Sequence, residues 1–162
     1  MRSLISVAAA VTLLGALFGA CGRDGHRGNG DDNYFSAFRT FNRTEWRYED
    51  TLKLRVDTLL DSVATGPLML SLRHTNGFQW SNLWIELSRR VDSVVIADTF
   101  NIPLADVAGN WYGNGTGPSR QLTHPLYEQC TLRIGDTLRV RHIMRVDTLE
   151  DIEQIGIVFN GE

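Results

Sequence analysis

Residues 68–87, LMLSLRHTNGFQWSNLWIEL, contain two short runs in which apolar and polar side chains alternate. A turn signal, Thr75-Asn76-Gly77, separates the runs, and both Asn and Gly accept the backbone angles that tight turns require. Alternation with a period of two is typical of a strand that shows one face to a core and the other to water. This stretch therefore predicts two half-buried β-strands joined by a turn.

The same period recurs along most of the chain. Further turn signals occur at Gly66-Pro67, Asn114-Gly115 and Gly135-Asp136. Short helices are possible at residues 57–64 and 147–154, but no long amphipathic helix is indicated. Many short strands at this spacing predict an all-β fold, an antiparallel, jelly-roll-like β-sandwich over residues 34–162. The other alternating runs are residues 52–56, 94–96, 138–146 and 155–159.

The first 20 residues differ from the rest. Met1-Arg2 is followed by the uncharged run LISVAAAVTLLGALFGA at residues 4–20, and then by Cys21. A basic start, an apolar run and small residues before a cleavage point indicate a secretory signal peptide. With a cysteine at the junction, the segment resembles the lipobox of bacterial lipoproteins, which implies lipidation (diacylation) of Cys21. Phe18 stands where that motif usually has Leu, Val or Ile, so an ordinary signal peptide or an uncleaved anchor stays open as an alternative.

Residues 21–33 follow as a lipidated cysteine and tether. Gly22 to Asn33 reads GRDGHRGNGDDN and has no apolar side chain to bury, so we expect a flexible linker. With Cys21 lipidated, Cys130 is the one thiol left and no disulfide can form within the chain. We expect Cys130 to be buried, and we expect stability to come from the hydrophobic core of one domain.

Charge and motifs argue against several classes of function. The chain has 16 basic and 19 acidic residues and so no general attraction for nucleic acid. Its histidines have no zinc-binding spacing, and there is no G-x-S-x-G nucleophile motif. His142 lies on the apolar side of its run and is expected to be a core residue. The sequence thus predicts no enzyme, cofactor or metal site, although a pair of carboxylates in a glycosidase cleft cannot be recognised from sequence. The four histidines are His26, His74, His124 and His142.

Two groups of residues are candidates for binding a partner. Arg139, Arg141 and Arg145 are expected on one face of the strand at residues 138–146, where Arg73 joins them if the strands pair suitably. We favour a solvated face answered by neighbouring carboxylates; the alternative is a site for an acidic partner, because arginine is common at interfaces.

The second candidate is the loop Gly109–Gly117, with four glycines around Trp111 and Tyr112. We favour Trp111 as a plug at the end of the core, with glycines supplying turns. The alternative is an exposed aromatic platform for a sugar ring or a protein. The loop does not lie between a strand and a helix, so phosphate binding is not predicted.

Three segments together resemble the GldH family of gliding-motility lipoproteins of Bacteroidota. They are LSLRHTNGFQWSNLWIEL at residues 70–87, LADVAGNWYGNGTG at 104–117 and HIMRVDTLEDIEQIGI at 142–157. Asp151 stands where the family pattern leads us to expect Gly. The resemblance implies a lipoprotein of the cell envelope without enzymatic activity, associated with gliding or type IX secretion. By analogy with proteobacterial sorting, Gly22 rather than Asp after Cys21 indicates transport to the outer membrane, with the leaflet left open. We therefore expect non-catalytic binding of envelope proteins, and the alternative is a carbohydrate-binding surface lipoprotein.

Overall fold

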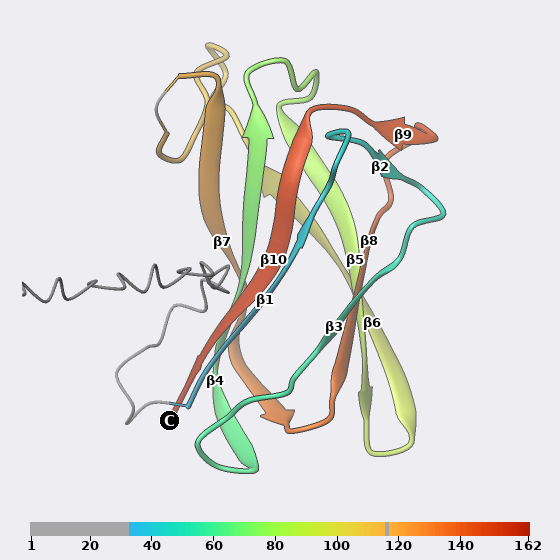
Figure 1. The fold of residues 1–162 in the computed structure, drawn as a ribbon, viewed down its shortest axis with the longest axis vertical. Coiled ribbons are helices and arrows are strands. Elements are labelled where there is room, and N and C mark those ends of the chain that lie inside the picture. The colour runs from blue at the N-terminus through green and yellow to red at the C-terminus, as the bar shows by residue number, and fades with distance from the viewer. Residues whose placement is uncertain (1–32, 116) are drawn as a thin grey trace, which may run out of the picture.

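The computed structural model describes residues 33–115 and 117–162. The predicted signal peptide, Cys21 and residues 22–32 of the predicted tether lie outside the described residues. Asn33, the last residue assigned to the tether, is instead a buried strand residue. Within the described part, every regular element is a β-strand (Figure 1). The strands are β1 (Asn33–Thr40), β2 (Trp46–Arg47), β3 (Leu52–Arg55), β4 (Val63–Thr75), β5 (Asn82–Val91), β6 (Val94–Pro103), β7 (Ser119–Arg133), β8 (Thr137–His142), β9 (Thr148–Leu149) and β10 (Ile152–Gly161).

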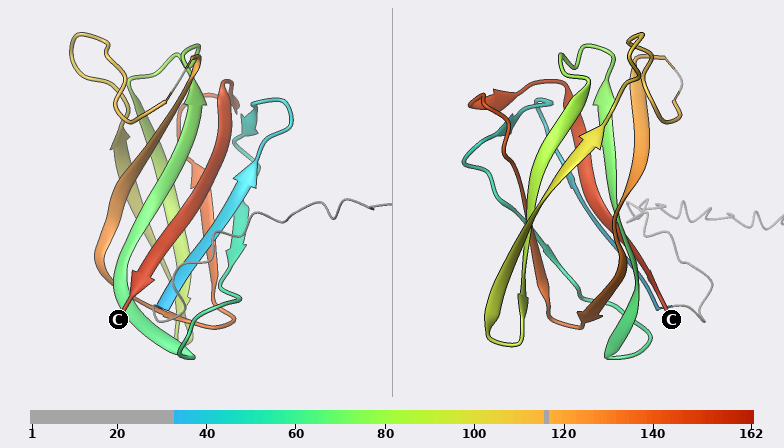
Figure 2. Two further views of the ribbon diagram at one scale, coloured as in Figure 1. Left: turned by 60° about the vertical axis from the view of Figure 1, so that its left-hand side comes forward. Right: turned by 180° about the vertical axis from the view of Figure 1, so that it is seen from behind.

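The strands form two four-stranded sheets that pack face to face. One sheet has the order β1-β10-β4-β7 and the other β3-β8-β5-β6, while β2 and β9 make a small separate pair (Figure 2). All pairings between described strands are antiparallel. Of the connections between sandwich strands, the β5–β6 hairpin stays within one sheet and the others cross to the opposite sheet. This is the jelly-roll arrangement, and it confirms the predicted all-β antiparallel sandwich.

The core lies between the two sheets and comes directly from the alternation. Leu68, Leu70 and Leu72 of β4 are fully buried, as is the facing set on β5. Burying one such side chain contributes about 1.5–3 kcal/mol. Cys130 also lies in this core as a free thiol, so the hydrophobic core rather than a disulfide holds the described domain together. The β5 set is Leu83, Ile85 and Leu87.

Three local expectations are corrected by the structure. Gly66-Pro67, expected to form a turn, lies inside β4, where the pairing with β7 has a register shift. Neither segment considered as a possible short helix is helical, since residues 57–64 lead into β4 and residues 147–154 contain β9 and the start of β10. The run at residues 138–146 is a strand only as far as His142. Beyond it, the Ile143 N–H donates to the Trp84 carbonyl and the Met144 sulfur accepts from the Trp84 N–H at 3.3 Å, so the pairing with β5 ends there. Apolar side chains continue past the strand because Met144 still packs on the core.

The sandwich has two ends, which we name for use below. The N-terminal end is where β1 starts and β10 finishes, together with the β3–β4, β5–β6 and β7–β8 connections (foot of Figure 1). The far end carries the β4–β5 loop, the long β6–β7 loop and the β2–β9 pair (Figure 1).

Candidate functional site

The long β6–β7 loop at the far end is tied to its neighbours by backbone hydrogen bonds. The N–H groups of Leu104 and Ala105 donate to the Ser81 carbonyl at 2.8 and 3.1 Å, which joins this loop to the β4–β5 loop. The Tyr112 N–H donates to the Leu104 carbonyl at 2.7 Å, so the loop folds back on itself. Further along, Asn114 and Gln121 exchange two hydrogen bonds of 2.8 Å. These bonds hold the described part of the loop in one conformation.

The tip of this loop is a tight turn built on Asp106. One oxygen of its carboxylate accepts the backbone N–H groups of Ala108 (2.9 Å) and Asn110 (2.8 Å), and the other accepts the Asn110 side-chain amide at 2.8 Å. The hydrogen bonds, chiefly that from the Asn110 side chain, lower the pKa of Asp106 below its ordinary value. Gly109 completes the turn at φ +85°, a conformation that favours glycine.

The other loop glycines serve different purposes. Gly113 also has φ +85°, and a Cβ added there would lie 2.3 Å from the Gln121 carbonyl oxygen. Gly115 does not have a positive φ, but an added Cβ would lie 2.1 Å from the Ser119 carbonyl oxygen. Glycine at 115 therefore allows close approach of two backbones rather than a left-handed turn, which the sequence did not distinguish.

Trp111 and Tyr112 have opposite environments. The Trp111 ring packs edge-on against His74, with ring centroids 4.7 Å apart, and it is half-buried against the core. His74 itself is fully buried beneath it, and that burial lowers the pKa of the imidazole below its ordinary value. Tyr112 is 46% exposed. The structure thus places Trp111 where a core plug is expected and leaves Tyr112 to face solvent.

Sequence reasoning missed two exposed tryptophans near this loop. Trp80 is 40% exposed and lies in the β4–β5 loop, one residue before the Ser81 carbonyl that binds Leu104. Trp84 is 41% exposed on the outer face of β5. Its position between buried Leu83 and Ile85 in the alternating pattern was the signal that could have revealed it. We refer to Trp80, Val107 and Tyr112, all exposed on the two joined loops, as the far-end surface.

The four arginines singled out from the sequence do not share one surface. Arg73 lies on β4, in the sheet opposite to β8, so the strand pairing that would bring it beside Arg139 and Arg141 does not occur. Arg145 is exposed but follows the end of β8 and is not on that strand. The physical reason is that the jelly-roll connections send β4 and β8 to different sheets.

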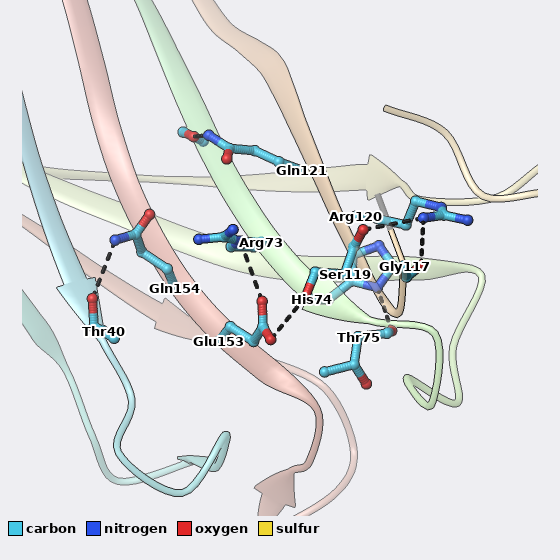
Figure 3. A network of polar contacts seen from close by, with 11 residues as sticks. Thr40, Arg73, His74, Thr75, Gly117, Ser119, Arg120, Gln121, Glu153 and Gln154 are labelled. Atoms are coloured by element: carbon cyan, nitrogen blue, oxygen red, sulfur yellow. Dashed lines mark hydrogen bonds and ion pairs between the residues drawn. The ribbon is translucent and has the colours of Figure 1, made fainter. Parts of the chain in front are cut away.

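Two of these arginines are already neutralised within the protein. Arg141 binds Glu86 on the neighbouring strand through two hydrogen bonds of 2.9 Å, and this carboxylate raises the pKa of Arg141. The Arg73 Nε lies 3.3 Å from a Glu153 carboxylate oxygen, and the other oxygen of Glu153 accepts the Ser119 hydroxyl at 2.9 Å (Figure 3). Both contacts are of the kind favoured from the sequence, in which solvent-exposed arginines pair with carboxylates on neighbouring strands.

Arg139 differs from these two. Its neighbours across the sheet are Lys53 on β3 and Ser88 on β5, and no ion pair to it is found among the described residues. A like charge directly opposite is unfavourable unless an anion answers it. Arg139 and the exposed Arg145, neither of which has an ion pair among the described residues, are therefore the cations of this group that can meet an acidic partner.

No catalytic or metal-binding constellation is found in the described part of the chain. His142 is fully buried, packs against Trp46 with ring centroids 5.2 Å apart, and has neither ring nitrogen in a hydrogen bond. Groups of three or more potential metal ligands do not occur within residues 33–115 and 117–162. A hollow of about 740 Å³ opens between the edges of β1 and β3 and is lined by residues such as Phe38 and Asp50. Within the described part of the chain, no helix is long and apolar enough to cross a membrane.

Comparison with known proteins gives one informative match. The sequence matches the GldH lipoprotein family over residues 33–159, which runs from the start of β1 almost to the end of β10. None of the curated proteins matches it.

Two solved structures are distantly similar. Eiger TNF from S. frugiperda is 12% identical, with a TM-score of 0.41 over 79% of this chain and 92% of that one. Dimeric latent PorU from Porphyromonas gingivalis is 11% identical, with a TM-score of 0.31 over 82% of this chain and 13% of that one.

Proposed function

Because the chain belongs to the GldH lipoprotein family, we propose that it is an accessory protein of the cell envelope, anchored to the outer membrane by lipid on Cys21. In this proposal it acts by binding other envelope proteins, and those of the gliding or type IX secretion machinery are the first candidates. The family is one of lipoproteins and is not a known enzyme family. A binding role is therefore the interpretation that the family and the exposed aromatic surface support best.

The anchor is supported by the sequence before β1. Cys21 follows a signal-peptide pattern, and the eleven residues between Cys21 and Asn33 contain no apolar side chain. Two or more acyl chains hold a protein stably at a bilayer, whereas one chain does so only marginally. Cys21→Ser is expected to abolish labelling by a palmitate analogue and to release the protein from the membrane fraction. Equal labelling of variant and wild type would disprove the anchor.

The observation that carries the binding role is the far-end surface. Trp80 and Tyr112 are large, about two-fifths exposed, and supported by loops whose backbones are hydrogen-bonded to each other. Aromatic side chains are enriched at protein interfaces, and a surface that is ordered before binding loses less entropy when a partner docks. The far end thus meets the usual requirements of a docking surface.

Site-specific photo-crosslinking in intact envelopes tests this role. A photoreactive amino acid at position 112 or 80 is expected to capture a discrete envelope protein. The matched control is position 129, where Gln129 is exposed on β7 away from both far-end loops. Identical products from all three positions, or none from positions 112 and 80, would contradict a partner at the far end.

Arg139, which has no ion pair among the described residues, offers a second, independent test. Arg139→Glu is expected to weaken capture if the partner is acidic and also covers this sheet. Arg73→Glu is the control, because Arg73 is already paired with Glu153 on the opposite sheet. Equal effects of the two variants would argue against a specific acidic contact at Arg139.

Carbohydrate binding is the second candidate, and the exposure of Tyr112 and Trp80 at one end is the observation that favours it. Glycan-array binding that is lost in Tyr112→Ala would support it. Trp111→Ala is a poor test because the Trp111 ring supports buried His74, so its loss disturbs folding as well. Absence of glycan binding by the wild type would leave the protein partner as the proposal.

A further inference from the structure

The N-terminal end of the sandwich exposes aliphatic side chains, unlike the aromatic far end. Leu60 is 62% exposed, Ile134 is 50% exposed, and the β5–β6 hairpin adds Val94 and Val95 at 64% and 53%. Exposed single apolar residues are ordinary, but a gathering at one end of a domain is informative. Val63 (43%) and Ile96 (38%) complete the set, which we call the aliphatic end.

Contacts between the connecting loops show that these residues belong to one end. The Ile134 N–H donates to the Ser62 carbonyl at 3.0 Å, which joins the β7–β8 turn to the β3–β4 connection. Arg133, beside Ile134, forms an ion pair of 3.8 Å with Asp92 in the β5–β6 turn. The three connections therefore lie side by side, as the foot of Figure 1 also shows.

The chain enters the domain at this same end. Asn33, the first residue of β1, exchanges two hydrogen bonds with Asp61, next to Leu60: its side-chain amide donates to the carboxylate at 3.0 Å and its oxygen accepts the Asp61 N–H at 2.8 Å. Any anchor on Cys21 thus pulls on the domain right beside the aliphatic end.

The length of the connecting segment favours this end over the other. Eleven residues separate Cys21 from Asn33, and a flexible chain of that length would span on the order of 20 Å root-mean-square. β7 alone has 15 residues, and at about 3.3 Å per residue the two ends are on the order of 40 to 50 Å apart. A bilayer that holds Cys21 therefore meets the aliphatic end far more often than the far end.

The charges around the aliphatic end are balanced, so any attraction of this end to a bilayer comes from its apolar side chains. Basic and acidic residues occur in equal number on the strand ends and connections here, with Lys53 and Glu162 among them, so net charge gives no specific attraction for anionic lipid. The other basic ones are Arg55, Arg90, Arg133 and Arg139, and the other acidic ones are Asp57, Asp61, Asp92 and Asp136.

We propose that the aliphatic end rests in the interfacial region of the lipid bilayer, with the tips carrying Leu60, Ile134 and Val95 among the lipid headgroups. The proposal rests on the lipid anchor at Cys21, because the short tether supplies the high local concentration that a few apolar tips need. Its consequence is a fixed orientation: the far-end surface points away from the membrane, toward partners, instead of tumbling about the anchor.

Spin labels on the full-length, lipidated protein in vesicles of phosphatidylethanolamine and phosphatidylglycerol test this orientation. Leu60→Cys and Ile134→Cys place labels at the aliphatic end, and Val107→Cys is the matched control because Val107 is fully exposed at the far end. The buried Cys130 of the parent protein serves as the unlabelled background. Labels at 60 and 134 are expected to collide more with oxygen, which dissolves in lipid, than with a water-soluble nickel complex, and the label at 107 is expected to show the reverse.

The possible outcomes separate docking from anchoring. If the protein stays on the vesicles but labels at 60 and 134 are as water-accessible as the label at 107, docking is refuted and the anchor stands. If the protein does not stay on the vesicles, the anchor and the docking both fail. If labels at position 60 couple to each other between molecules, the aliphatic end joins two copies of the chain and the lipid-docking proposal is overturned.

Discussion

Two glycines of the far-end loop allow a matched test of how that loop is held. Gly109 and Gly113 share φ +85°, yet an alanine Cβ would meet nothing within 4 Å at position 109 and would lie 2.3 Å from the Gln121 carbonyl oxygen at position 113. The pair therefore separates the cost of the backbone angle from the cost of the contact.

The two costs can be worked out from the structure. For alanine, a left-handed conformation costs roughly 1–2 kcal/mol, and the stiffer unfolded chain returns about 0.4–1 kcal/mol. Gly109→Ala is thus expected to lower the free energy of unfolding by about 1 kcal/mol. Gly113→Ala must also displace the Asn114–Gln121 pair, whose two 2.8 Å hydrogen bonds are worth about 0.5–1.5 kcal/mol each. Its expected loss is about 2–4 kcal/mol.

Urea unfolding of both variants, followed by tryptophan fluorescence, measures the difference. In thermal unfolding the losses correspond to about 4 °C for Gly109→Ala and on the order of 10 °C for Gly113→Ala in a domain of this size. Gly113→Ala is also expected to reduce photo-crosslinking from position 112, while Gly109→Ala retains it. Equal destabilisation by the two variants would refute the claim that backbone contact with β7 holds the loop.

Three further predictions concern the interior and the ion pairs. Burial lowers the pKa of His74 and His142 below the ordinary 6.5, so the unfolded chain binds protons more tightly than the folded one. The free energy of unfolding is therefore highest above about pH 6.5, and it falls as the pH drops toward the lowered pKa values of the two histidines. The urea midpoint should drop between pH 7.5 and 5.5, less so in His142→Gln, and an unchanged midpoint in the wild type would contradict this. Burial raises the pKa of Cys130, so alkylation of its thiol should require urea, and rapid labelling of the native protein would show the site to be open. The Arg141–Glu86 pair is partly exposed, so a double-mutant cycle should yield a coupling of about 0.5–1 kcal/mol that weakens with salt; a salt-independent coupling would indicate a desolvated pair.

The strands of the core were predictable because their signal is local. Leu68, Leu70 and Leu72 repeat every second residue, and a strand is the backbone that puts such residues on one face. The buried state of His142 and Cys130 followed from the same argument, since each lies on the apolar side of its run or lacks a partner. For the far-end loop, the glycine pattern correctly indicated turns at positions 109, 113 and 117.

The structure explains why Asp151 can stand where the family pattern led us to expect Gly. Asp151, where Gly was expected, has φ +65°. Aspartate is among the few residues that visit the left-handed region, because its side chain can make local hydrogen bonds. In this protein the hydrogen bonds of Asp151 reach a distant strand: its carboxylate accepts the Thr75 hydroxyl at 2.5 Å and its carbonyl accepts the Thr75 N–H at 2.9 Å. The substitution keeps the turn and ties β10 to the end of β4.

Sequence by itself determined that this chain makes strands, which side of the core strands is buried, and which family it resembles. Each of these depends on residues close together in the chain or on a shared pattern. The run at residues 94–96 is the exception, because Val94 and Ile96 are both exposed. Only the tertiary structure decided that Arg73 and Arg141 lie on opposite sheets, that Tyr112 is exposed while Trp111 is packed, and that the aliphatic tips gather where the chain enters the domain. Those outcomes depend on which strands pair and on how loops distant in sequence meet. Period-two alternation is the same for every possible pairing, so it carries no information about them.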